Sequence, residues 1–90
     1  MVWLLKAHPL IEKDLKRLSK TEKEYLSQLI LRIKENPNRF KPLTGYAGCF
    51  RIRFSGLRLV YAINRETIWL IIVDKRKRVY KEMAKRIKGL

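Results

Sequence analysis

The stretch CFRIRFSGLRLVY, residues 49–61, decides the fold because it holds two strand-like runs joined by Ser55-Gly56. In the first run, apolar and basic residues alternate, and successive side chains of a strand point to opposite faces of a sheet. A two-residue loop at Ser55-Gly56 sets the register by equal counting back from the turn, which pairs Arg53 with Arg58. The sequence therefore predicts an antiparallel β-hairpin with a basic face.

Three guanidinium groups are expected on that basic face, those of Arg51, Arg53 and Arg58. Like charges directly opposite each other destabilise a sheet. At a separation of about 7 Å, two of them repel by roughly 0.6 kcal/mol in water and roughly 2.4 kcal/mol at an effective dielectric constant of 20. This cost is modest on a wet surface, so the pattern indicates a face that binds an anion.

Composition indicates one globular domain spanning residues 1–90, since the chain is too short for two cores. It is 47% hydrophobic, with only four glycines and three prolines, which excludes a disordered or fibrous protein. The single cysteine, Cys49, cannot form an intramolecular disulfide, so we expect a reducing, cytoplasmic setting. No segment is long enough to span a membrane, and the apolar stretch near the N-terminus is shorter than a signal-peptide core.

Charge is distributed unevenly along the chain. Twenty-two basic and eight acidic residues give a net charge of +14. Residues 1–36 hold 8 basic and 5 acidic residues, a net +3, whereas residues 37–90 hold 14 and 3, a net +11. This asymmetry favours a polyanionic partner, most simply nucleic acid, with an anionic membrane or an acidic protein as weaker alternatives. The remaining explanation is that the excess of positive charge only keeps the protein soluble.

The N-terminal part is expected to form one strand and two helices. Residues 2–7 form a short β-branched and aromatic run that Pro9 ends, and Pro9 is also a good first residue of a helix. Two overlapping capping boxes within residues 19–24 mark the start of a second amphipathic helix, which ends at Asn36. Because the connection between the two helices is short, they are expected to form an antiparallel helical hairpin.

The C-terminal half is expected to contain three antiparallel strands and a helix. Residues 67–73, which follow the hairpin, are apolar nearly throughout, as in a central strand covered on both faces. Val79, Met83 and Ile87 form the apolar stripe of a basic helix. The order β, α, α, β, β, β, α predicts an α+β domain of two layers, with the helices grouped on one side of an antiparallel sheet.

Common catalytic arrangements are absent from the sequence. The four glycines do not form a phosphate-binding loop. One histidine, one cysteine and acidic residues placed mostly on the solvent-facing sides of helices predict neither a metal site nor a cofactor site. His8, at a strand-to-helix junction, is expected to cap the helix or face solvent.

Arginine and tyrosine are the remaining candidates for chemistry. Arg51, Arg53 and Arg58 share the predicted sheet face, and Arg76 and Tyr80 follow the last strand. If the helix already begins at residue 76, Arg76 and Tyr80 lie one turn apart on the same side. Guanidinium groups bind phosphate oxygens through paired hydrogen bonds and stay charged. A solvated charged face with a core tyrosine is the alternative interpretation.

Two segments, LTGYAGCFRIRFSGLRLVYAI and VDKRKRVYKEMAKRI, resemble the RelE/ParE superfamily of toxins from toxin-antitoxin systems, and more specifically its RelE branch. The similarity in element order and length covers nearly the whole chain, whereas the specific motifs lie in residues 43–61 and 73–87. The resemblance implies the two-layer RelE-like fold. It also implies a ribosome-dependent endoribonuclease that cuts messenger RNA in the ribosomal A site.

In that family the ribose 2′-oxygen attacks the adjacent phosphorus without a metal ion, leaving a 2′,3′-cyclic phosphate. Carried over by position, the resemblance makes the site residues Arg51, Arg53, Arg58, Arg76 and Tyr80. Arg58 and Arg76 are then phosphate clamps, and Tyr80 accepts the 2′-hydroxyl proton or stacks on a base. Family members carry lysine where this chain has Arg51 and Arg53, which leaves no obvious proton donor for the leaving 5′-oxygen.

The resemblance also implies partners: the ribosome, messenger RNA, and an acidic, amphipathic antitoxin that covers the toxin in a hetero-oligomer. The surfaces expected beneath the antitoxin are the helical hairpin, the apolar stripe of the C-terminal helix and the basic cleft. Two alternatives remain open at this point. One is a ParE-like toxin that inhibits gyrase, and the other is a catalytically inactive module that binds RNA or the ribosome.

Overall fold

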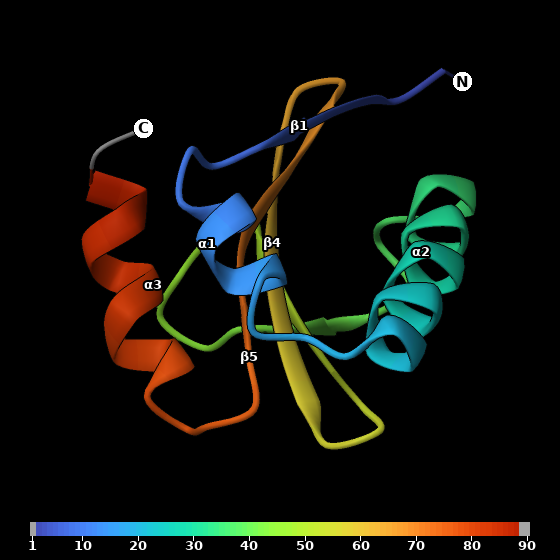
Figure 1. The fold of residues 1–90 in the computed structure, drawn as a ribbon. Coiled ribbons are helices and arrows are strands. Elements are labelled where there is room, and N and C mark those ends of the chain that lie inside the picture. The colour runs from blue at the N-terminus through green and yellow to red at the C-terminus, as the bar shows by residue number, and fades with distance from the viewer. Residues whose placement is uncertain (1, 89–90) are drawn as a thin grey trace.

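The computed structural model describes residues 2–88 of the chain. A five-stranded sheet lies at the centre of the domain. Its spatial order is β1-β5-β4-β3-β2, and helices lie on both sides of it (Figure 1). Along the chain the elements are β1 (Leu4–Ala7), α1 (Ile11–Leu15), α2 (Lys20–Glu35), β2 (Lys41–Pro42), β3 (Cys49–Phe54), β4 (Leu57–Asn64), β5 (Thr67–Asp74) and α3 (Val79–Lys88). No helix of residues 2–88 is long and apolar enough to cross a membrane.

The hairpin of β3 and β4 has the register expected from the sequence. Arg53 lies opposite Arg58, and Phe54 lies opposite Leu57. Both residues of the loop have positive φ, 45° at Ser55 and 79° at Gly56, as a two-residue turn of type I′ requires. The turn therefore places the arginines of both strands on one face.

Two features of the sheet differ from the expectation. β1 pairs in parallel with β5, so the sheet is only mostly antiparallel. A fourth antiparallel strand, β2, adds Lys41 opposite Arg51 and Pro42 opposite Phe50 at the free edge of β3. A two-residue strand has no periodicity to reveal it, and its proline is tolerated because it lies at an edge.

The capping box expected at the start of α2 is present. The Ser19 hydroxyl accepts a hydrogen bond from the Glu22 amide at 3.1 Å, and the Glu22 carboxylate accepts one from the Ser19 amide at 2.8 Å. The first helix, α1, covers only five residues. The capping role considered for His8 is not found, since α1 has no side-chain cap; the His8 Nδ1 instead accepts a hydrogen bond from the Leu10 amide in the turn before the helix.

Two apolar cores lie on opposite faces of the sheet. Side chains of α1 and α2 pack with one face of β3, β4 and β5, and side chains of α3 pack with the other face of β4 and β5. Figure 1 shows α2 and α3 on opposite sides of the sheet. The expectation that all helices lie on one side of a two-layer domain is therefore wrong for α3, although the N-terminal helices share one face as predicted. The physical reason is that β4 and β5 are apolar on both faces, so both faces must be covered.

A β-bulge in β5 adapts the sheet to α3. Val60 pairs with Ile72 but Tyr61 pairs with Leu70, so Ile71 is an extra residue on the β5 side. As a consequence, consecutive residues Ile71 and Ile72 both belong to the core beneath α3.

A buried ion pair joins α1 to α3. Arg86 donates to Asp14 through Nη1 at 2.6 Å and Nη2 at 2.9 Å, and Asp14 also accepts a hydrogen bond from the Val73 amide. Only 4% of the Asp14 surface and 8% of the Arg86 surface are exposed. The expectation that acidic side chains face solvent is thus wrong for Asp14.

Candidate active site

The centre of the candidate site is a contact between β3 and α3. Arg51 projects from the face of β3 opposite to Phe50 and Ile52, because side chains alternate along the strand. Its Nη1 donates a hydrogen bond to the Tyr80 hydroxyl oxygen at 3.2 Å, and its guanidinium carbon lies 6.0 Å from the centre of the Tyr80 ring. Two residues predicted from the sequence to act together are therefore in contact.

Arg53 and Arg58 lie beside this contact on the same sheet face. They are cross-strand neighbours, and Arg53 is exposed whereas Arg58 is half-buried. Arg58 donates from Nη1 to the Lys75 carbonyl oxygen at 2.8 Å, which ties β4 to the loop before α3. Within residues 2–88, neither side chain forms an ion pair, so both charges remain available to an external anion.

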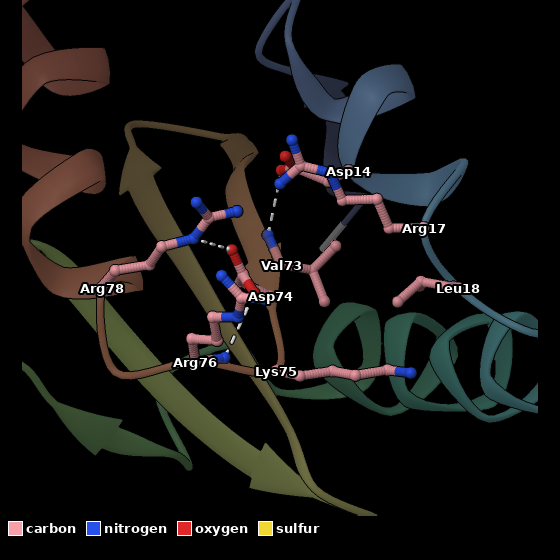
Figure 2. A pocket seen from close by; sticks show the side chains of 8 residues that line it. All are labelled: Asp14, Arg17, Leu18, Val73, Asp74, Lys75, Arg76 and Arg78. Carbon is pink, nitrogen blue, oxygen red and sulfur yellow. Dashed lines mark hydrogen bonds and ion pairs between the residues drawn. The ribbon is translucent and has the colours of Figure 1, made fainter.

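Arg76 lies in the turn between β5 and α3, not in the helix. The Val79 amide donates to the Arg76 carbonyl oxygen, and α3 begins only at Val79. The condition under which Arg76 and Tyr80 would share one helical face, a helix that begins at residue 76, is therefore not met. The Arg76 side chain instead lines a separate cavity of about 340 Å³ between α1 and this turn, whose lining includes neither Arg51 nor Tyr80 (Figure 2). Its lining consists of Asp14, Arg17, Leu18, Val73, Asp74, Lys75, Arg76 and Arg78.

Charges around this cavity are only partly compensated. Asp14 is neutralised by Arg86, Asp74 pairs with Arg78 at 2.9 Å, and the Lys75 ammonium lies 3.2 Å from Glu22. Within residues 2–88, Arg17 and Arg76 form no ion pair. The cavity therefore presents two uncompensated guanidinium groups, a suitable environment for a phosphate.

Asp74 organises the turn that carries Arg76. Burial opposes ionisation of its carboxyl group, but hydrogen bonds from the Arg78 side chain and the Arg76 amide, together with the Arg78 charge, outweigh burial and hold its pKa below the ordinary value. Figure 2 shows Asp74 between the side chains of Arg76 and Arg78. An ionised Asp74 thus accepts hydrogen bonds from both the backbone and a side chain of the turn.

Two basic residues near the site were not predicted from the sequence. Arg17 lines the cavity, and nothing in its spacing along the sequence indicates this. Lys41 stands in a stretch without a strand pattern, yet it lies in β2 directly opposite Arg51. Across residues 2–88 no group of three or more His, Cys, Asp or Glu side chains could hold a metal ion.

The fold and this site define a class: a small, strongly basic α+β domain with a tyrosine on one sheet face beside guanidinium groups that form no ion pair with any described residue. A family model described as the ParE toxin of the type II toxin-antitoxin system parDE matches residues 5–80. The mRNA interferase toxin RelE of Escherichia coli is 37% identical over 82 residues, covering 83% of this chain and 86% of the relative. The chain therefore belongs to the RelE/ParE superfamily of type II toxin-antitoxin toxins.

Solved structures support the same assignment. The chain superposes on a mutant of E. coli toxin RelE in the free state with a TM-score of 0.85 and 30% identity, covering 97% of this chain and 99% of that one. The E. coli RelBE toxin-antitoxin complex gives a TM-score of 0.77 with 28% identity, over 84% of this chain and 99% of that one. The RelE-like fold expected from the sequence is thus confirmed.

Proposed function

We propose that this protein is a ribosome-dependent endoribonuclease that cuts messenger RNA in the A site and thereby inhibits translation. The observation that carries the proposal is the Arg51–Tyr80 contact at 3.2 Å, on a sheet face with two further guanidinium groups that form no ion pair within residues 2–88. The named relatives that are mRNA interferases of the RelE type support it. Such a function is exerted in the cytoplasm.

In the proposed reaction the 2′-oxygen attacks the adjacent phosphorus, and the P–O5′ bond breaks to leave a 2′,3′-cyclic phosphate. The pentavalent transition state carries more negative charge than the substrate, so fixed guanidinium groups stabilise it preferentially. Arg51, Arg53 and Arg58 supply these charges from the sheet, and Tyr80 binds or accepts the proton of the 2′-hydroxyl. Arg76 binds a neighbouring phosphate from the cavity in Figure 2.

We also propose an acidic, amphipathic antitoxin as partner, because solved relatives include the RelBE complex of E. coli and RelBE2 of Mycobacterium tuberculosis. Leu10, Tyr25 and Leu31 are exposed on the N-terminal helices or beside them and offer apolar contacts. The apolar stripe of α3 was expected to lie beneath the antitoxin, but it is not available for that contact, since Val79 and Met83 are fully buried against the sheet. The free basic face is the complementary surface for the acidic chain.

Arg58→Ala and Tyr80→Phe test the proposal. Each is expected to lower single-turnover cleavage on programmed ribosomes by roughly 2–4 kcal/mol in the barrier, if it removes one charge-stabilising contact. Ribosome binding is expected to change far less. Arg32→Ala and Tyr25→Phe, which alter exposed side chains of α2, are the matched controls. Equal losses of cleavage and binding would instead indicate an RNA-binding or ribosome-binding module without catalysis.

A second candidate function is gyrase inhibition, because the family model that matches the chain is that of the ParE toxin. Toeprinting of translated messenger RNA with purified protein distinguishes the two functions. Cuts at A-site codons support the nuclease. Absence of cuts, together with inhibited DNA supercoiling, would support the ParE-like function.

A further inference from the structure

We propose that Lys41 is the general acid that protonates the leaving 5′-oxygen. The inference rests on the proposed nuclease function. It names the proton donor for the leaving oxygen, a role that Arg51 and Arg53 cannot fill. Guanidinium groups hold their protons at any working pH, whereas an ammonium group can donate one.

The sheet register places Lys41 on the site face. Lys41 lies directly opposite Arg51 in the antiparallel pair of β2 and β3. Directly opposite residues project from the same face, with their Cβ atoms roughly 5 Å apart. Alternation agrees, since Phe40 packs with the core beneath α1 and α2, whereas Leu43 packs with the core beneath α3. The Lys41 side chain therefore extends on the face that carries Arg51.

Lys41 and Tyr80 flank Arg51 from opposite sides. β3 lies between β2 and β4 in the sheet, and Tyr80 packs with the α3 core over β4 and β5. Lys41 approaches Arg51 from β2, the other direction. In an in-line displacement the attacking and leaving oxygens lie on opposite sides of the phosphorus. A phosphate held by Arg51 can thus have its 2′-oxygen toward Tyr80 and its 5′-oxygen toward Lys41.

Lys41 is chemically free for this step. It is exposed, and it forms no ion pair with any residue from 2 to 88. By contrast, the Lys75 ammonium lies against Glu22 at 3.2 Å. In the step, the bond from the 2′-oxygen to phosphorus forms, the P–O5′ bond breaks with its electron pair on the 5′-oxygen, and the Lys41 Nζ proton moves to that oxygen. Water then returns a proton to Lys41.

The test uses Lys41→Arg, which keeps the charge and removes the exchangeable acid. Single-turnover cleavage on programmed ribosomes is measured with ordinary messenger RNA and with the same RNA carrying sulfur at the 5′-bridging position. A thiolate leaves without protonation, so the variant is expected to lose about 100-fold or more on the oxygen substrate and less than about 5-fold on the sulfur substrate. Ribosome binding and the melting temperature are expected to stay unchanged.

Controls separate this role from competing ones. Lys23→Arg on α2 and Lys81→Arg on α3 are expected to behave as the unmodified protein on both substrates. A Lys41→Arg loss of equal size on both substrates, or no loss at all, overturns the inference while leaving the nuclease function intact. If the unmodified protein cleaves neither substrate, the nuclease proposal fails first, and the role of Lys41 fails with it.

Discussion

The buried ion pair between Asp14 and Arg86 gives the sharpest prediction about stability. Asp14→Leu removes the counter-charge of the Arg86 guanidinium group, which is only 8% exposed. Arg86→Met likewise removes the counter-charge of the Asp14 carboxylate, which is only 4% exposed. Removing one partner of a buried pair costs about 3–5 kcal/mol. A domain of this size has roughly 4.5–13.5 kcal/mol of stability in total. Each single variant is therefore expected to lose a large fraction of it.

The double variant Asp14→Leu/Arg86→Met removes both charges together. Its remaining costs are the Val73 amide, which donates to Asp14 at 3.2 Å in the intact protein, and the Ile71 carbonyl oxygen, which accepts a hydrogen bond from Arg86 Nη1 at 2.9 Å. An unpaired buried donor costs about 1–3 kcal/mol. We therefore expect the double variant to be more stable than either single variant. Additive losses would show that the two side chains do not stabilise each other and would refute the reasoning.

Urea denaturation, followed by circular dichroism, gives the free energy of unfolding of all three variants, and thermal melts followed in the same way give their Tm. A loss of 3 kcal/mol corresponds to a fall in Tm of roughly 12–24 °C for a domain of this size. Glu82→Ala is the control, since it breaks the exposed pair with Lys85, whose N–O distance is 3.5 Å. Exposed pairs contribute less than about 1 kcal/mol, so the control is expected to unfold almost as the unmodified protein does.

Two further predictions concern acid stability and backbone conformation. Burial raises the pKa of Asp74, but hydrogen bonds and the Arg78 charge outweigh burial and hold this pKa below its ordinary 3.8. The stability that the ionised Asp74 contributes is therefore complete above pH 3.8 and is lost as pH falls through the pKa of the folded protein. Asp74→Asn should therefore unfold with a shallower pH dependence in melts between about pH 2 and pH 6, and an unchanged slope would contradict this. Gly48→Ala should cost more than the left-handed penalty of about 1–2 kcal/mol, because φ is +77° and the new Cβ would lie 3.2 Å from the Ile63 carbonyl oxygen. Gly56→Ala, with φ of +79° and open space around the Cβ, should cost only that penalty, and equal Tm losses would show that the contact is unimportant.

Most of the fold could be predicted from the sequence because its signals are local. Alternation and a two-residue turn sufficed for the register of β3 and β4, and the capping box marked the start of α2. The short strand β2 and the end of α1 could not be predicted in this way. Both depend on neighbours distant in sequence, and neither is long enough to show a periodicity.

The candidate site was predictable in its residue types and only partly in its geometry. Arg51, Arg53 and Arg58 share a face, as the turn requires, and Tyr80 meets Arg51. Arg76 would lie beside Tyr80 only if the helix began at residue 76, but α3 begins at Val79 and Arg76 lines a cavity against α1. Its position depends on where α3 begins, which the hydrogen bonds of Asp74 to the turn help to determine.

By itself, the sequence determined the charge of this protein, its α+β element types and the basic face of its hairpin, because composition, side-chain period and turn chemistry act over a few residues. Only the tertiary structure decided that α3 covers the second face of the sheet, that Asp14 lies buried against Arg86, and that Lys41 stands beside Arg51. These features join residues 72 positions apart in one case and ten in another. The position of α3 follows from the need to cover both apolar faces of β4 and β5. No local pattern encodes such a requirement, since it is met only when the whole chain packs.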